Sequence, residues 1–107
     1  MIQIDKKHEG EAKNAMLAAF SSSHEIKHVV VVDPDVDIYN MQDIEWAIAT
    51  RFQASKDLVI ISGAASNKLD PSTCHGVGDK MGLDATVPLD AESGKYERIS
   101  IPERKGN

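Results

Sequence analysis

The stretch HVVVVDPDVDIYN, residues 28–40, constrains the fold of this chain more than any other feature. Its four valines are β-branched and have no polar residue between them, which is typical of a strand buried on both faces. Pro34 cannot donate a ladder hydrogen bond, so the strand must end before it. We therefore predict a buried, parallel strand at residues 28–32.

A helix and a second strand are predicted directly after this strand. Asn40 can accept hydrogen bonds from the first helical turn, and Asp43 suits the positive end of a helix that we expect over residues 41–52. Residues 57–61, DLVII, are typical of a second buried strand. This order indicates a right-handed crossover between parallel neighbours. The predicted fold class is α/β: one small domain with a βαβ parallel core and a mixed sheet flanked by helices.

Another helix is expected before the valine run. Residues 10–22 carry Ala12, Met16 and Phe20 at helical spacing, which predicts an amphipathic helix that ends at a run of serines. In the helix over residues 41–52, Trp46 lies off the apolar side, and we expect it to pack in the core or an interface. Both helices therefore have one face to bury against the sheet.

The second half of the chain changes in character. Residues 62–82, SGAASNKLDPSTCHGVGDKMG, are rich in Gly, Ser, Asn, Asp and Pro, which predicts a long functional loop after the second strand. Residues 96–101 alternate like a half-exposed last strand, and we expect residues 102–107 to be a frayed tail.

Charge and cysteine content exclude several classes of protein. The 12 Lys and Arg against 17 Asp and Glu give a net charge of −5, which disfavours binding to nucleic acid. No apolar segment reaches the roughly 18 to 20 residues that cross a membrane, and the first residues do not resemble a signal peptide. The single Cys74 excludes an internal disulfide. We expect residues 1–107 to form one cytoplasmic domain.

The aspartates after the valine run are the clearest candidate for a metal site. Asp33, Asp35 and Asp37 resemble the start of a calcium-binding EF-hand loop, but Ile38 and Ile44 stand where that loop needs Gly and Glu. The pattern favours carboxylates that bond nearby backbone N–H groups and shape the exit from the strand. A magnesium or phosphate-linked site at the carboxyl end of the strand stays open.

Other candidate residues are weak. Cys74 and His75 are sequence neighbours whose side chains point apart in an extended loop, so they make a poor nucleophile and base. Gly76, Gly78 and Gly82 depart from the dinucleotide-binding spacing, but they suit a loop with unusual backbone angles. We assign no catalytic, cofactor-binding or metal-ligating residue in this chain.

Four ordered motifs resemble a known family. KHVVVVDPDVDIYNMQDIEWAIATRF, DLVIISG, LDPS and GVGDKMGLDATVPL, within about residues 10–89, resemble the C-terminal domain of UbiD-type decarboxylases, the 3-octaprenyl-4-hydroxybenzoate carboxy-lyase family. The resemblance implies a lyase system that decarboxylates aromatic or α,β-unsaturated acids with prenylated FMN and a divalent metal in the complete enzyme. The catalytic Arg and Glu residues of that family belong to a larger flavin-binding domain. We therefore expect this chain to bind no cofactor and to catalyse nothing by itself.

The resemblance also implies a role for the chain. It would pack on a flavin-binding domain or subunit, close the substrate pocket, and contribute contacts to a homo-oligomer. Leu69 best matches the family's apolar substrate-facing position, with Ala65, Ser66 and Asn67 beside it. A purely structural role, in which Leu69 anchors the loop to the core, stays open. Lys80 is expected on the surface, with an ion-pairing role as the alternative. The alternative function is a stand-alone structural or interaction protein of the same fold.

Overall fold

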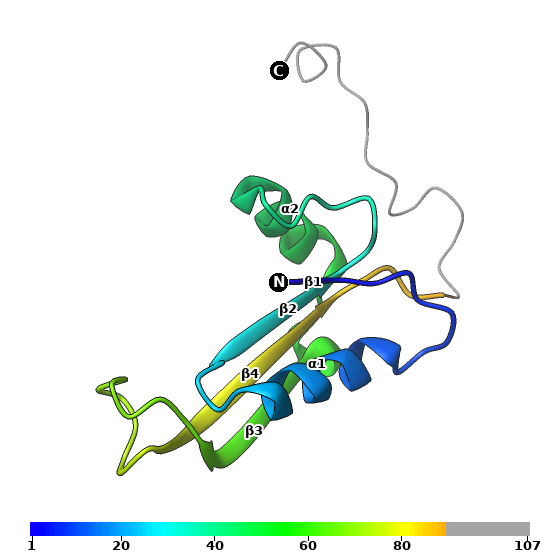
Figure 1. The fold of residues 1–107 in the computed structure, drawn as a ribbon. Helices are drawn as coiled ribbons and strands as arrows, with labels where there is room; N and C mark the ends of the chain where they lie inside the picture. The colour runs from blue at the N-terminus through cyan, green and yellow to red at the C-terminus, as the bar shows by residue number, and fades with distance from the viewer. Residues whose placement is uncertain (90–107) are drawn as a thin grey trace.

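The computed structural model describes residues 1–89 of the 107-residue chain. Its helices and strands follow one another in a mixed order along the chain (Figure 1). In order they are β1 (Ile2–Gln3), α1 (Glu11–Ser22), β2 (His28–Val32), α2 (Met41–Arg51), α3 (Ala54–Asp57), β3 (Leu58–Ala65) and β4 (Val77–Ala85). The four strands form one sheet in the order β1-β2-β4-β3, with β3 antiparallel to β4 and the other pairs parallel. The predicted α/β class, with a mixed sheet and flanking helices, is confirmed.

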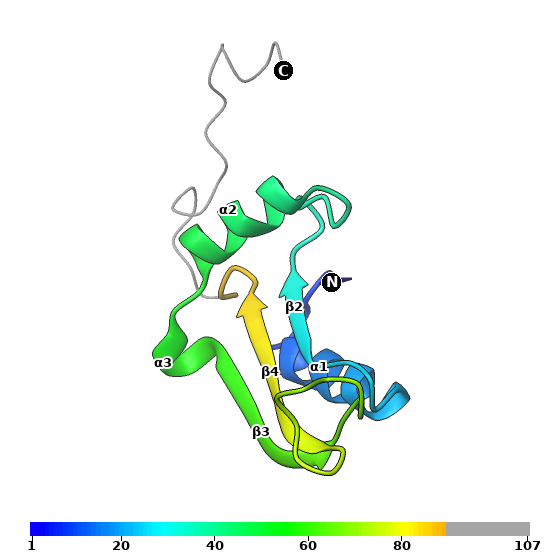
Figure 2. The same cartoon turned by 90° about the vertical axis from the view of Figure 1, so that its left-hand side faces the viewer.

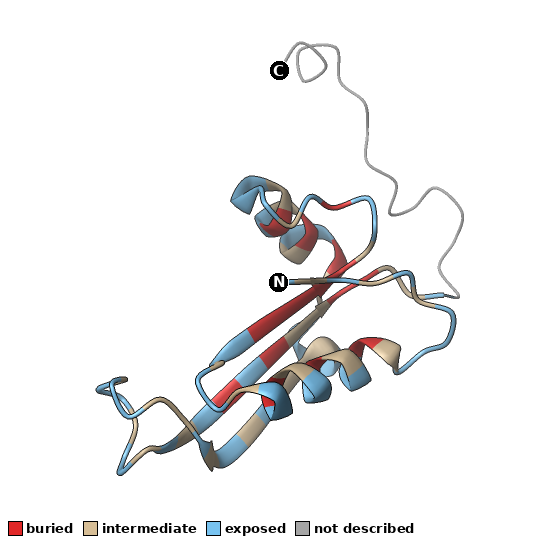
Figure 3. Cartoon of the chain, in the orientation of Figure 1, coloured by how far each residue is buried: buried red, intermediate tan, exposed pale blue. Residues whose placement is uncertain are grey.

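Strand β2 lies inside the sheet, between β1 and β4. Val29 and Val31 pack with the buried residues of α1, whereas Val30 and Val32 pack with those of α2. Successive side chains of a strand point to opposite faces, so a strand between two helices needs apolar residues at every position. Figure 3 shows the buried residues concentrated on β2 and on the helix sides that face it. The predicted buried, parallel strand is confirmed.

Helix α1 covers one face of the sheet (Figure 1). Its buried residues are Ala12, Met16 and Phe20, which confirms the predicted apolar stripe. Gly82 of β4 lies directly beneath it, where an added Cβ would stand 2.5 Å from the Met16 Sδ atom. The close approach of the helix to β4 therefore depends on the missing side chain at this glycine.

Helix α2 covers the other face, near the carboxyl end of β2. The Asn40 Oδ1 atom accepts hydrogen bonds of 3.0 and 3.4 Å from two N–H groups of the first turn, which confirms the predicted N-cap. Ile44 and Ala47 are fully buried, and Trp46 packs partly buried against the same cluster. The expected core packing of Trp46 is also confirmed.

The predicted pairing of residues 28–32 and 57–61 as parallel neighbours is wrong. Strand β4 lies between β2 and β3, and the parallel strand–helix–strand unit is formed by β1, α1 and β2. Strand β3 is not buried on both faces either, because it is an edge strand whose Ile60 is 63% exposed. The sequence VGDKMGLDA of β4 escaped the prediction, since Gly, Asp and Lys are depleted in strands.

The connection after β3 is shorter than predicted. Strand β3 continues to Ala65 and β4 begins at Val77, so residues 66–76 alone form the loop in place of residues 62–82. Figure 2 shows this connection at the end of the sheet opposite to α2. The two strands are paired antiparallel, so their glycine-rich parts lie in the sheet.

Two predictions concern segments outside the described residues: the strand at residues 96–101 and the tail at residues 102–107. Within residues 1–89, no helix is long and apolar enough to cross a membrane. That finding agrees with the lack of a long apolar segment in the sequence.

Candidate functional site

The carboxyl ends of the parallel strands β2 and β4 lie side by side. Asp33 follows β2 directly, and Arg51 at the end of α2 reaches it, with 3.0 Å between Nη1 and Asp33 Oδ2. The same guanidinium makes two hydrogen bonds of 2.9 Å to the carboxylate of Asp35. The Arg51 side chain is only 2% exposed, so two carboxylates hold a buried cation at this corner.

The environment of this corner perturbs its ionisable groups. Burial raises the pKa of the Asp33 carboxyl, although the Val87 N–H donates to Asp33 Oδ2 at 2.9 Å. The hydrogen bonds to Asp35 raise the pKa of the Arg51 guanidinium above its ordinary value. The Asp37 Oδ1 atom accepts a 2.9 Å hydrogen bond from the N–H two residues later. The predicted bonding of carboxylates to backbone N–H groups is confirmed at Asp33 and Asp37, whereas Asp35 binds the Arg51 guanidinium.

The magnesium site that the sequence left open at this corner gains no support. The nearest carboxylates bind a guanidinium and backbone N–H groups. Across residues 1–89, no group of three or more His, Cys, Asp or Glu side chains is arranged to hold a metal ion. The corner is therefore a structural clamp between β2, α2 and the end of β4.

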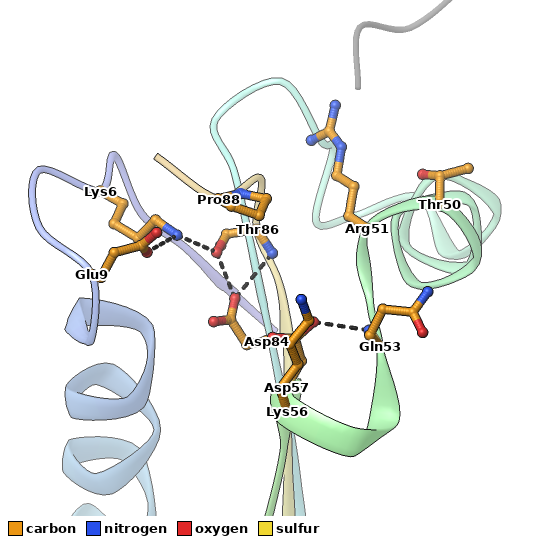
Figure 4. Close-up of a pocket in the computed structure, with 10 residues that line it drawn as sticks. All are labelled: Lys6, Glu9, Thr50, Arg51, Gln53, Lys56, Asp57, Asp84, Thr86 and Pro88. Atoms are coloured by element: carbon orange, nitrogen blue, oxygen red, sulfur yellow. Dashed lines mark hydrogen bonds and ion pairs between the residues drawn. The ribbon is translucent and has the colours of Figure 1, made fainter. Parts of the chain in front are cut away.

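A pocket of about 310 Å³ opens beside this clamp (Figure 4). Its walls come from the segment after β1, the end of α2, helix α3 and the end of β4. The charged residues on its walls are the cations Lys6, Arg51 and Lys56 and the carboxylates Glu9, Asp57 and Asp84. Because the signs are matched, the pocket has no excess charge with which to attract an anion or a cation.

The polar groups in the pocket bind one another. The Lys6 Nζ atom lies 2.8 Å from Glu9 Oε1 and donates to Thr86 Oγ1 at 3.1 Å. The Thr86 hydroxyl in turn donates to the Asp84 carboxylate. The hydrogen bond from Lys6 to the Glu9 carboxylate holds the pKa of Glu9 below its ordinary value. These contacts fasten the segment after β1 to the end of β4.

The residues predicted for a substrate pocket lie at the opposite end of the sheet. Ala65 ends β3, and Ser66, Asn67 and Leu69 belong to the loop at residues 66–76. The Leu69 side chain is 87% exposed, so it does not anchor the loop to the core. The Asn67 Oδ1 atom accepts a 2.9 Å hydrogen bond from the Leu69 N–H, which is an Asx-turn. The loop thus presents an apolar side chain outward on an ordered backbone.

The other end of this loop is a tight turn. Cys74 and Val77 exchange backbone hydrogen bonds of 2.9 and 3.0 Å. Between them, His75 with φ 55° and Gly76 with φ 77° both adopt the left-handed conformation that a type I′ turn requires. The expected unusual backbone angles are confirmed at Gly76 but are wrong for Gly78 and Gly82, which lie within β4 and have no positive φ.

Lys80 is not the surface residue that we predicted. It is 4% exposed, and its Nζ donates to the carbonyl oxygens of His24 at 3.0 Å and Ile26 at 2.5 Å. It closes the turn between α1 and β2. Only the knowledge that residues 77–85 form a strand, with Lys80 on the face toward α1, could have revealed this position.

Part of the sheet near the loop is not covered by any of residues 1–89. Ile60 and Met81 are direct partners across β3 and β4, and Val77 lies on the same face as Met81. All three side chains are exposed, whereas Leu83, two positions after Met81, packs against the cluster under α2. We call Ile60, Val77 and Met81 the strand surface. An exposed apolar group of this kind is typical of a binding face.

Fold and sequence together define the family. The 3-octaprenyl-4-hydroxybenzoate carboxy-lyase C-terminal domain family matches residues 1–85. The chain belongs to this family, the UbiD-type decarboxylases, which confirms the resemblance seen in its motifs.

Particular relatives are closely similar. Anhydromevalonate phosphate decarboxylase of Aeropyrum pernix is 58% identical over 102 residues, which are 95% of this chain and 23% of the relative. The UbiD-class enzyme HmfF from Pelotomaculum thermopropionicum, solved in complex with FMN, superposes with a TM-score of 0.90 at 55% identity, over 98% of this chain and 24% of HmfF. An evolved dimeric form of HmfF has been solved in complex with prFMN.

A third relative has been solved in two states. Vanillic acid decarboxylase of Sedimentibacter hydroxybenzoicus in closed form superposes with a TM-score of 0.80 at 32% identity, over 94% of this chain and 22% of that one. An open form of it has also been solved. The chain spans about a quarter of the length of the relatives it matches.

Proposed function

We propose that this chain packs on the flavin-binding domain of a UbiD-type decarboxylase and closes its substrate pocket with the loop at residues 66–76. The observation that supports this most is Leu69, which an ordered Asx-turn holds 87% exposed. Single exposed apolar residues are common on protein surfaces, so the proposal rests on this exposure together with the family resemblance, which implies an apolar, substrate-facing side chain at this position. The chain is not catalytic alone.

Closure of the pocket fits the physical requirements of decarboxylation. Removal of water from the site strengthens the electrostatic interactions that act on the reacting carboxylate. Loop or domain closure also positions the substrate against the cofactor. The open and closed forms of the related vanillic acid decarboxylase support such a motion in the family.

The cofactor belongs to the partner domain in this proposal. Prenylated FMN would supply an electron sink for the carbanion left by carbon dioxide, and a divalent metal would accompany it. The FMN and prFMN complexes of HmfF support the flavin part. This chain would contribute to the substrate pocket the apolar side chain of Leu69. The polar Ser66 and Asn67 and the small Ala65 lie near it in the sequence. A cytoplasmic location stays a prediction.

A fusion protein tests the role of the loop. This chain would replace the matching segment of the Aeropyrum pernix relative, and carbon dioxide release from anhydromevalonate phosphate would be measured after loading with prFMN. We expect an active fusion, which Leu69→Asp slows by about tenfold or more because a carboxylate enters the closed pocket. Leu17→Asp, at an exposed leucine on α1, is the matched control and should leave the rate unchanged.

Two outcomes contradict the proposal. A folded, prFMN-loaded fusion that releases no carbon dioxide, while the unmodified relative does, would show that the chain cannot supply this domain's role. Equal rates for Leu69→Asp and Leu17→Asp would show that the loop does not meet the substrate.

The alternative, a stand-alone interaction protein of the same fold, has one observation in its favour. The strand surface of Ile60, Val77 and Met81 lies on and beside an edge strand, where a second copy could pair. A stable homodimer in size-exclusion chromatography, with an inactive fusion, would favour this alternative. In the decarboxylase, the same surface would serve the oligomer contacts that we expect.

A further inference from the structure

The loop that presents Leu69 is fastened to the sheet from a distant part of the chain. Lys27, just before β2, places its Nζ 2.8 Å from Asp70 Oδ2 and 3.0 Å from Ser72 Oγ. The carbonyl of Lys27 accepts a 3.0 Å hydrogen bond from the Met81 N–H of β4. One residue therefore joins the loop to a strand edge whose position the sheet fixes.

Asp70 is the centre of the turn that follows Leu69. Its Oδ1 atom accepts hydrogen bonds from both the N–H and the hydroxyl of Ser72, at 2.9 and 2.6 Å. Its backbone N–H donates to the Asn67 carbonyl at 3.0 Å, and its own carbonyl accepts from the N–H of Thr73 at 3.1 Å. One Asp70 oxygen therefore orders the turn, and the other is left for the Lys27 ammonium.

We propose that Lys27 is a positioning residue: through Asp70 and Ser72 it fixes where the Leu69 turn stands, and so where Leu69 meets the partner domain. The inference rests on the proposed function, because it concerns the geometry of the same loop. It adds Lys27, 42 positions before Leu69, which opens the first family motif but to which the resemblance assigned no role.

Loss of the Lys27 contact should affect the loop locally and not the stability of the whole domain. The Lys27 side chain is 57% exposed, and exposed ion pairs contribute little to the free energy of unfolding. Hydrogen bonds, and not apolar burial, hold the tip of the loop, since Leu69 itself is exposed. The ammonium of Lys27 also holds the pKa of the Asp70 carboxyl far below its ordinary range, so the carboxylate stays charged well below neutral pH. Loss of Lys27 should therefore loosen the loop and leave the fold intact.

Hydrogen exchange on this chain tests the fastening directly. In Lys27→Met, which keeps the apolar stem and removes the charge, the amides of Leu69 and Ser72 should exchange about tenfold faster at an unchanged melting temperature. Lys27→Arg should restore most of the protection, because it keeps a cation at the site. Asp70→Asn keeps the Oδ1 acceptor and removes the charge, so it should match Lys27→Met. Unchanged exchange in Lys27→Met would overturn the inference.

The fusion protein tests the consequence for catalysis. With equal prFMN content and melting temperature, Lys27→Met should lower kcat/KM about fivefold, and Lys27→Arg should stay near the unmodified fusion. If exchange accelerates while kcat/KM stays constant, the positioning role is overturned, although the proposed function stands as long as Leu69→Asp slows the reaction. An inactive unmodified fusion overturns the proposed function and this inference with it, whatever the exchange rates.

Discussion

Two buried cations show how single residues hold the ends of this sheet. Arg51 binds two carboxylates at the carboxyl end of β2, and Lys80 binds two backbone carbonyls at the turn before β2. A buried cation is tolerated only with such partners, because the loss of water is costly. Both residues therefore contribute to the stability of the domain.

Replacement of Arg51 by Met should destabilise the domain strongly. It leaves the Asp33 carboxylate partly buried without its guanidinium, so we expect a loss of about 3 kcal/mol in the free energy of unfolding. Urea denaturation measures this loss. Thr50→Met, at the exposed neighbour in the same helix turn, should change it by less than about 0.5 kcal/mol. Similar midpoints for both variants would contradict the role of the clamp.

Glu9 gives a prediction about pH. Its pKa is lowered in the folded state by Lys6, so its stabilising effect is present above the unfolded pKa of about 4.3 and is lost as the pH falls through the lower folded value. Glu9→Gln should therefore lower the melting temperature at neutral pH, and the difference from the unmodified chain should shrink in acid. Glu25→Gln, at an exposed acid, is the control. A difference in melting temperature that grows as the pH falls would contradict this prediction.

At the scale of elements, the sequence predicts those helices and strands whose signals lie within the element itself. The run at residues 28–32, the stripe of α1 and the Asn40 cap of α2 each predicted an element that the structure contains. Strand β4 was missed because its Gly and Lys residues are explained by contacts with residues far away in the sequence. Gly82 lies under Met16, and Lys80 reaches the turn before β2. No local pattern reports such contacts.

The residues of the candidate site also differ in whether the sequence could predict them. Leu69 was found through a family resemblance, since an apolar residue in a polar loop has no periodicity to place it. The contact between Lys27 and Asp70 joins residues 43 positions apart, and it exists only because β2 and β4 pair. The sequence could point to Leu69 as a candidate, but it could not predict that Lys27 contacts the turn beside it.

The packing of α1 on β4 gives a prediction for two elements. Gly82→Ala would place a methyl group against the Met16 sulfur, so we expect a loss of about 1–3 kcal/mol in the free energy of unfolding from overpacking. Met16→Ala should lose about 2–5 kcal/mol because it leaves a cavity. The double variant should lose less than the sum, because the new methyl group occupies part of that cavity. Additive losses in urea denaturation would contradict direct packing.

At the scale of the whole molecule, residues 1–89 form a sheet that its helices cover unevenly. Helices α1 and α2 bury β2 between them, but β3 is an edge strand without Lys, Arg, Asp, Glu or Pro. Edge strands of soluble proteins usually carry such residues to prevent pairing with other chains. A domain that lacks them on an exposed edge is suited to contacts with another polypeptide, which agrees with a chain spanning about a quarter of its relatives.

The isolated chain should therefore associate with itself through β3 when its concentration is raised. Ile60→Lys places a charge in the middle of the strand surface and should weaken this association about tenfold or more, as measured by sedimentation. Because Ile60 is 63% exposed, its replacement should leave the melting temperature nearly unchanged. Tyr39→Lys is the matched control, since Tyr39 is 92% exposed but lies near the start of α2, away from β3. If Tyr39→Lys weakens association and Ile60→Lys does not, the contact face lies at the carboxyl end of β2, on the side of the Arg51 clamp.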